Sequence, residues 1–136
     1  REAFADCRIT SIIIPEGVKM IEQNVFRYGR KLMNVAILNG VESIGDSAFA
    51  ACISLSSLTI PESVSSIGND PFYCCSPDVY MRGSTPPDIS RGCFRTGPRT
   101  FYVPIDAVDT YKNYYGWDDY SDRIIGYDFE NDQIVE

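Results

Sequence analysis

The stretch LSSLTIPESVSSIGNDPF, residues Leu55–Phe72, is one complete copy of a repeat around which the chain is organised. Its first half places apolar residues three and then two positions apart and ends in a proline: Leu55, Leu58, Ile60 and Pro61. Its second half returns with an apolar pair and a phenylalanine: Val64, Ile67 and Phe72. This spacing is typical of a solenoid coil, in which a short strand buries one side and the second pair returns to the same core.

The same unit recurs along the chain in several independent columns. Successive phenylalanines lie 22 or 23 residues apart, at Phe4, Phe26, Phe49, Phe72 and Phe94. Two further columns repeat every 23 residues: Val18, Val41 and Val64, and Ile21, Ile44 and Ile67. The columns predict a repeat solenoid of about five coils of 22–23 residues each.

Each predicted coil carries a short strand with alternating inward and outward residues. The inward sets are Ile9/Ile12/Ile14, Leu32/Val35/Ile37, Leu55/Leu58/Ile60, Val79/Met81 and Phe101/Val103. A proline follows three of the strands, at Pro15, Pro61 and Pro104, and Asn39 is taken as its replacement in the second coil. We expect Gly45 and Gly68 to supply a positive φ in the turns, and the pair Pro86-Pro87 to prevent a second strand in the fourth coil.

The pattern LxxLxIPxxVxxIGxxAFxxC resembles the BspA-like leucine-rich repeats. It is carried by IPEGVKMIEQNVF, LNGVESIGDSAFAAC and IPESVSSIGNDPFYCC, and the closing segment FYVPIDAVDTYKNYYGW is similar to the end of that family's repeat arrays. The resemblance implies a right-handed, mainly β solenoid with a parallel sheet on its concave side. It also implies a non-enzymatic adhesion or binding role, in the extracellular space or on the outer cell surface of a host-associated bacterium.

One domain is expected from 136 residues, with the solenoid at 1–104 and a C-terminal cap and acidic tail at 105–136. Asp106 is a candidate N-cap for a helix at about 107–115. The predicted inner face of that helix comprises Ala107, Val108, Tyr111 and Tyr115, and the end of the core is covered by Trp117, Tyr120 and Ile124. Residues 126–136 are either a frayed tail or an edge strand.

The first coil is interrupted, because Arg1 falls inside a repeat and the half-coil that would precede Phe4 is absent. We therefore expect the repeat array to be truncated at this end, with further repeats before residue 1. The net charge of −7 is confined to residues 104–136, since residues 1–103 carry ten acids and ten bases. Without a basic stripe, no nucleic-acid partner is expected. Without an apolar run of roughly 20 residues, no direct membrane insertion is expected.

The composition offers little for catalysis or metal binding. The chain has no His, which disfavours Ser-His-Asp and Cys-His catalysis and most zinc sites. Of five cysteines, Cys7, Cys52 and Cys75 follow a repeat phenylalanine by three residues and form a structural column. A Cys52–Cys75 disulfide is conceivable, and Cys74 or Cys93 could face solvent as free thiols.

Two acidic clusters remain, one at 118–122 and one at 128–132. They form a solvated acidic face or, alternatively, ligate calcium, although no DxDxDG loop is present. A paired-carboxylate hydrolase needs two carboxylates held across a cleft, which clusters in a cap and a tail do not provide. We predict no enzymatic activity, no cofactor and no metal.

The outward strand residues give the candidate site. Stacked strands align them in two columns: Ile13, Ala36, Thr59, Tyr80 and Tyr102, and Ser11, Asn34, Ser57, Asp78 and Thr100. The predicted ligand-binding residues are Tyr80, Tyr102, Thr59, Asp78, Ser57 and Asn34, because tyrosines flanked by small polar groups suit protein or glycan recognition. Two alternatives stay open. The tyrosines pack on each other or on the cap, or the chain only closes a longer repeat array and has no ligand site of its own.

Overall fold

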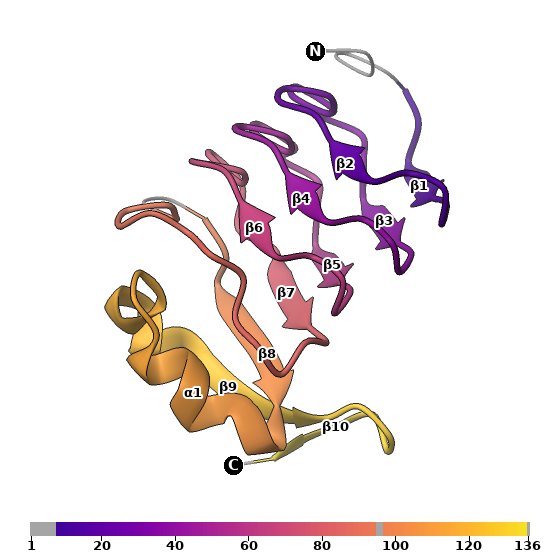
Figure 1. Cartoon of the computed structure of the whole chain (residues 1–136). Helices are drawn as coiled ribbons and strands as arrows, with labels where there is room; N and C mark the ends of the chain where they lie inside the picture. The colour runs from indigo at the N-terminus through magenta and orange to yellow at the C-terminus, as the bar shows by residue number, and fades with distance from the viewer. Residues whose placement is uncertain (1–7, 95–96, 136) are drawn as a thin grey trace.

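The computed structural model describes residues 8–94 and 97–135 as a solenoid whose coils stack along one axis (Figure 1). The main sheet has seven strands in the order β1-β3-β5-β7-β8-β9-β10, and every neighbouring pair is parallel except β9 and β10. The strands are β1 (Ser11–Ile14), β3 (Asn34–Ile37), β5 (Ser57–Ile60), β7 (Asp78–Met81), β8 (Thr100–Pro104), β9 (Ile124–Asp128) and β10 (Gln133–Val135). The predicted repeat solenoid is confirmed.

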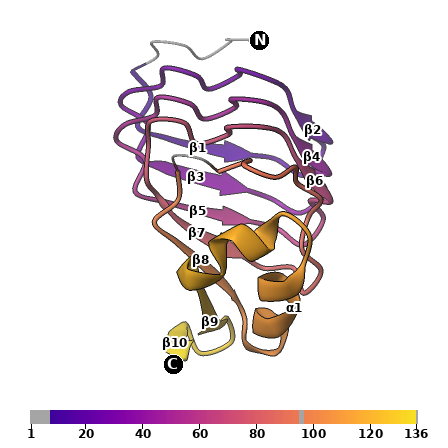
Figure 2. The same ribbon diagram turned by 90° about the vertical axis from the view of Figure 1, so that its left-hand side faces the viewer.

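A second, three-stranded parallel sheet forms the other side of the coils. It consists of β2 (Met20–Ile21), β4 (Ser43–Ile44) and β6 (Ser66–Ile67), which stack as a separate row beside the main sheet (Figures 1 and 2). In the fourth coil this row continues only as a single bridge between Ser66 and Asp88. The predicted effect of Pro86-Pro87 is confirmed, since no strand forms there.

The phenylalanine column is the spine of the core. Ring centroids of Phe26 and Phe49 lie 5.2 Å apart, those of Phe49 and Phe72 5.8 Å apart, and those of Phe72 and Phe94 6.4 Å apart, all stacked. Trp117 of the cap lies 5.4 Å from Phe94 and closes the row. Phe4 lies outside the described residues. Ile9 was expected to point inward but is 39% exposed. It lies before the start of β1 at Ser11 and is therefore not held by the strand.

The turn glycines act differently from the prediction. Gly45 and Gly68 do not have a positive φ; non-glycine residues adopt it in two columns with a 23-residue period, Asn24, Ser47 and Asp70, and Tyr28, Ala51 and Cys74. A Cβ on Gly45 would lie 2.5 Å from the backbone nitrogen of Gln23, and one on Gly68 2.7 Å from that of Asp46. These glycines are therefore required by the close approach of neighbouring coils.

The strand register also corrects one alignment. Ile14 pairs with Ile37, so Leu38 rather than Asn39 occupies the position of the post-strand proline. Leucine retains the backbone N–H that proline lacks, and the Leu38 N–H donates to the Ile14 carbonyl at 3.0 Å.

The described cysteines are thiols, and three of them are buried. Cys52 Sγ donates to the carbonyl of Phe26 at 3.0 Å, and Cys75 Sγ contacts the carbonyl of Phe49 at 3.5 Å, so each thiol bonds to the preceding coil. The conceivable Cys52–Cys75 disulfide is absent. Cys74 is exposed whereas Cys93 is buried, and Cys7 lies outside the described residues.

The cap contains three short helices: η1 (Ile105–Ala107), α1 (Val108–Asn113) and η2 (Trp117–Arg123). The predicted helix is therefore shorter than 107–115, and no side chain caps its N-terminus. Tyr111 and Trp117 are buried and donate to carbonyls of the fourth coil, at Gly83 (2.7 Å) and Pro87 (2.8 Å). Tyr115 was wrongly placed on the inner face. Tyr114 has extended backbone angles and ends α1, and Tyr115 in the turn that follows is 64% exposed.

The tail is an edge strand, one of the two alternatives that the sequence left open. β9 adds to the main sheet beside β8, and β10 pairs with β9 in an antiparallel hairpin. The sequence had assigned Ile124 to cover the end of the core, and it is buried there, but its place in a strand was not foreseen. None of the helices in the described residues is long and apolar enough to cross a membrane.

Candidate functional site

The structure aligns both predicted outward columns on one face of the main sheet, here called the sheet face. Register pairs join Ile13 to Ala36, Thr59, Tyr80 and Tyr102 in sequence across β1, β3, β5, β7 and β8. The neighbouring column joins Ser11 to Asn34, Ser57, Asp78 and Thr100 in the same way. All six predicted site residues therefore lie on one continuous surface.

The two tyrosines of this face pack against each other and against the C-terminal hairpin. Tyr80 and Tyr102 stack with ring centroids 4.6 Å apart, and Tyr127 of β9 meets their rings at 5.2 and 5.6 Å. Both tyrosines are half-buried. Part of each ring is thus committed to internal packing, and a role in ligand binding stays a prediction for both.

The hairpin that follows β9 carries the contacts that hold Tyr127 in place. The Tyr127 hydroxyl donates to Asp132, and the Phe129 ring lies 4.8 Å from the Tyr127 ring. Burial raises the pKa of Tyr80, and the neighbouring Tyr102, Asp78 and Asp132 raise it further. Tyr80 therefore presents a hydroxyl group rather than a phenolate at neutral pH.

Polar side chains of the sheet face form fewer contacts within the protein on the N-terminal strands than on β7. Asp78 pairs with Arg99, with Nε and an Asp78 carboxylate oxygen 3.4 Å apart. Asn34 is exposed and Ser57 and Thr59 are partly exposed, and within the described residues their side chains form no hydrogen bond. This half of the sheet face offers polar groups that a ligand could satisfy.

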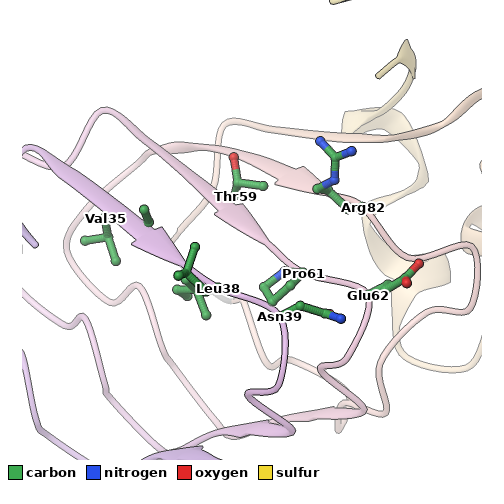
Figure 3. Close-up of a pocket in the computed structure, with 9 residues that line it drawn as sticks. Val35, Leu38, Asn39, Thr59, Pro61, Glu62 and Arg82 are labelled. Carbon is green, nitrogen blue, oxygen red and sulfur yellow. The ribbon is translucent and has the colours of Figure 1, made fainter. Parts of the chain in front are cut away.

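A depression of about 480 Å³ opens where β3, β5 and β7 end (Figure 3). It is lined by Val35, Ala36, Ile37, Leu38, Asn39, Thr59, Pro61, Glu62 and Arg82. Sequence reasoning included Thr59 but missed Leu38, Glu62 and Arg82, because the columns were traced only within the strands. One more step of the same register was the available signal, since Arg82 follows Met81, the partner of Ile60.

The acidic clusters are engaged with protein groups. Arg91 bridges Asp118 at 3.2 Å and Asp119 at 2.9 Å, and this hydrogen bonding lowers the pKa of Asp118. Asp128 accepts from the backbone N–H groups of Glu130 and Asn131. Across residues 8–94 and 97–135, no three Cys, Asp or Glu side chains are grouped so that they could hold a metal ion.

A comparison with known protein families matches residues 1–100 to the BspA type leucine rich repeat region, in six copies. The chain belongs to this BspA-type leucine-rich repeat family. The match contains one copy more than the five coils counted from the phenylalanine column. No curated protein matches the chain.

The BspA-type repeats and the segment after them contribute different parts of the candidate site. Most of the floor of the sheet face lies within the matched repeats, including Ser57, Thr59 and Tyr80, and Tyr102 lies just beyond them. Tyr127 and Phe129, which pack over its C-terminal end, lie beyond residue 100. The sheet face is therefore a repeat surface with a wall added by the cap.

Proposed function

We propose that this BspA-type repeat protein is a non-enzymatic interaction module that binds a protein or a glycan through the sheet face. The observation that carries the proposal is the set of outward side chains on β1, β3 and β5. On β1 and β3 these side chains are exposed: Ser11, Ile13, Asn34 and Ala36. Figure 1 shows these strands at the edge of the solenoid that is farthest from the C-terminal helices. They stand on a backbone fixed by parallel pairing, so a partner finds the surface already ordered.

The chemistry of the face suits recognition rather than catalysis. Small side chains spaced by one strand separation, about 4.8 Å, allow close approach, and the half-buried tyrosines add contact area with a polar tip. The chain has no His, and the adjacent aspartates Asp118 and Asp119 are already paired with Arg91. By analogy with the family, the proposed setting is the surface of a bacterium or the space outside it.

A second candidate function is a structural one, in which the chain closes a longer array of repeats. The supporting observation is an apolar depression of about 400 Å³ at the first coil, whose lining includes Ile13, Met20, Val25 and Phe26. Ile13 and Met20 are 66% and 56% exposed. Another repeat stacked on this side would cover this depression. Concentration-dependent self-association that Met20→Glu abolishes would favour this function.

The test of the main proposal is a binding screen against extracellular-matrix proteins and host glycans. The protein is compared with Asn34→Arg, Thr59→Arg and the Tyr80→Ala/Tyr102→Ala double variant. The matched control is Glu42→Arg, an exposed position beside β4 of the second sheet. We expect the sheet-face variants to lose at least about tenfold in affinity and the control to bind as the original protein does. A partner that binds all four variants equally well would refute the sheet face as the site.

A further inference from the structure

Arg82 is an exposed arginine that is held in place at both ends of its side chain. Its backbone N–H donates to the Ile60 carbonyl at 3.0 Å, which fixes the base of the side chain at the end of β7. Its guanidinium carbon stands 4.8 Å from the centroid of the Phe129 ring in the C-terminal hairpin. Stacking restrains a guanidinium but leaves the N–H groups along its edge available to a ligand.

No carboxylate of the described residues uses those N–H groups. Arg82 takes part in no ion pair or side-chain hydrogen bond there, although Glu62 lines the same depression. Arg99, just before β8, is different because it already pairs with Asp78 at 3.4 Å. Within residues 8–94 and 97–135, Arg82 is therefore a restrained cation that pairs with no carboxylate.

The depression beside Arg82 combines this cation with an apolar floor. Thr59 and Arg82 project to the same side of the strands, next to Leu38 and Pro61 (Figure 3). The Thr59 hydroxyl makes no hydrogen bond within the described chain. The site thus offers a guanidinium edge, a hydroxyl and an aliphatic surface in one hollow of about 480 Å³.

We propose that this depression binds an acidic peptide segment, with a Glu or Asp carboxylate on Arg82 and an adjacent aliphatic side chain over Leu38 and Pro61. A carboxylate takes two parallel hydrogen bonds from a guanidinium edge, which matches the groups left open. Glu62 at the rim disfavours a doubly charged phosphate and can accept an N–H of the peptide. The floor is aliphatic rather than aromatic, which favours a peptide over a sugar ring. This inference rests on the proposed function, of which it specifies the site and the partner.

The experiment is an NMR titration of the protein with two peptides blocked at both ends, acetyl-Leu-Glu-amide and acetyl-Leu-Gln-amide. Glucuronic acid and acetate serve as further probes. We expect the Glu peptide to shift the amide signals of Leu38, Thr59 and Arg82, and the Gln peptide to bind at least about tenfold more weakly. Binding of the Glu peptide should weaken with added salt, because the contact is an ion pair close to solvent.

Variants of Arg82 separate the effect of the two parallel hydrogen bonds from the guanidinium from the effect of its positive charge. Arg82→Gln should abolish the shifts, and Arg82→Lys should restore only a small part, because a lysine cannot form the paired contact. Arg99→Gln is the matched control and should bind as the original protein does. Equal binding of the two peptides, unaltered binding by Arg82→Gln, or no shift with either peptide would overturn the proposal. Shifts with glucuronic acid alone would assign the depression to a glycan instead.

The two proposals can fail separately. A partner from the binding screen that is lost with Thr59→Arg and retained with Arg82→Gln would support the sheet face and refute the carboxylate site. Binding of the Glu peptide at Arg82 without any effect of Asn34→Arg or Thr59→Arg on the screened partner would do the reverse.

Discussion

At the scale of single residues, Phe49 is the centre of the core. Its ring is fully buried and stacks between those of Phe26 and Phe72. We predict that Phe49→Ala lowers the free energy of unfolding by about 3–5 kcal/mol, because it removes the ring and leaves a cavity between two coils. Denaturant unfolding measures this loss. The control is Tyr73→Ala, which removes an exposed aromatic ring and should cost little stability. A loss below about 1 kcal/mol for Phe49→Ala would contradict the alignment of the coils that stacks the phenylalanine rings.

The glycine at position 68 is a second residue-scale test. A Cβ there would come within 2.7 Å of the Asp46 backbone nitrogen, so Gly68→Ala should push two coils apart. We expect a loss of about 1–3 kcal/mol in unfolding free energy. Gly17→Ala is the control, since nothing lies within 4 Å of the site where its Cβ would stand. Equal stability of the two variants would show that the coils are not in close contact at this turn.

The buried thiols make stability dependent on alkaline pH. Burial raises the pKa of Cys52 to about 11 and that of Cys75 and Cys93 to about 12, above the ordinary value of 9.0. The folded state therefore holds protons that the unfolded state releases above pH 9.0, so their stabilising contribution is full below that pH and falls as pH rises. Unfolding free energies measured on both sides of pH 9.0 should decline on the alkaline side, and Cys52→Ala/Cys93→Ala should make the decline shallower. An unchanged slope in that variant would contradict thiol burial.

At the scale of elements, α1 is fastened to the fourth coil by one buried hydroxyl. Tyr111 donates to the Gly83 carbonyl at 2.7 Å. Tyr111→Phe should cost about 1 kcal/mol in thermal or denaturant unfolding, because it removes this bond and leaves the buried carbonyl unpaired. Tyr115→Phe is the matched control on the same segment, and its exposed ring predicts no change. A loss of the same size in both variants would argue against the docking of α1 seen here.

The sequence predicts the strands well because two signals agree. Alternation within each strand assigns inward and outward residues, and the 23-residue columns align one strand with the next. For this reason the sequence predicts the columns through Thr59 and Ser57, and the strand register confirms them. The sequence pattern could not show why Gly45 and Gly68 are glycines. A position that requires a positive φ and a position where a neighbouring backbone leaves no room for a Cβ are both occupied by glycine, so the two look identical in the sequence.

The cap was less predictable because its contacts lie outside the repeat. β9 follows the short 3-10 helix η2 and pairs with β8. The 23-residue repeat does not extend to β9, so no column of repeated residues predicts this pairing. For the same reason the packing of Tyr127 on Tyr80 could not be read from the sequence, and neither could the stacking of Arg82 on Phe129. The candidate site was therefore predictable in its floor and not in its wall.

At the scale of the whole molecule, the proposed binding surface lies on one side of the solenoid, the main sheet. Strand pairing in both sheets and hydrogen bonds in the turns join each coil to the next, and the main sheet also presents an outer row of side chains. The excess negative charge lies after residue 103, so the repeats themselves are neutral. A partner of either sign can approach the repeat surface without strong long-range repulsion from the coils below it.

Amide hydrogen exchange, measured with and without a bound partner, shows whether a ligand occupies the sheet face. A partner recovered from the matrix-protein and glycan screen is added, and protection is mapped along the chain. We predict slower exchange in β3, β5 and β7 and in residues 38–40, with β2, β4 and β6 unchanged. Protection confined to β2, β4 and β6, or to the cap, would show that the partner binds elsewhere than on the sheet face.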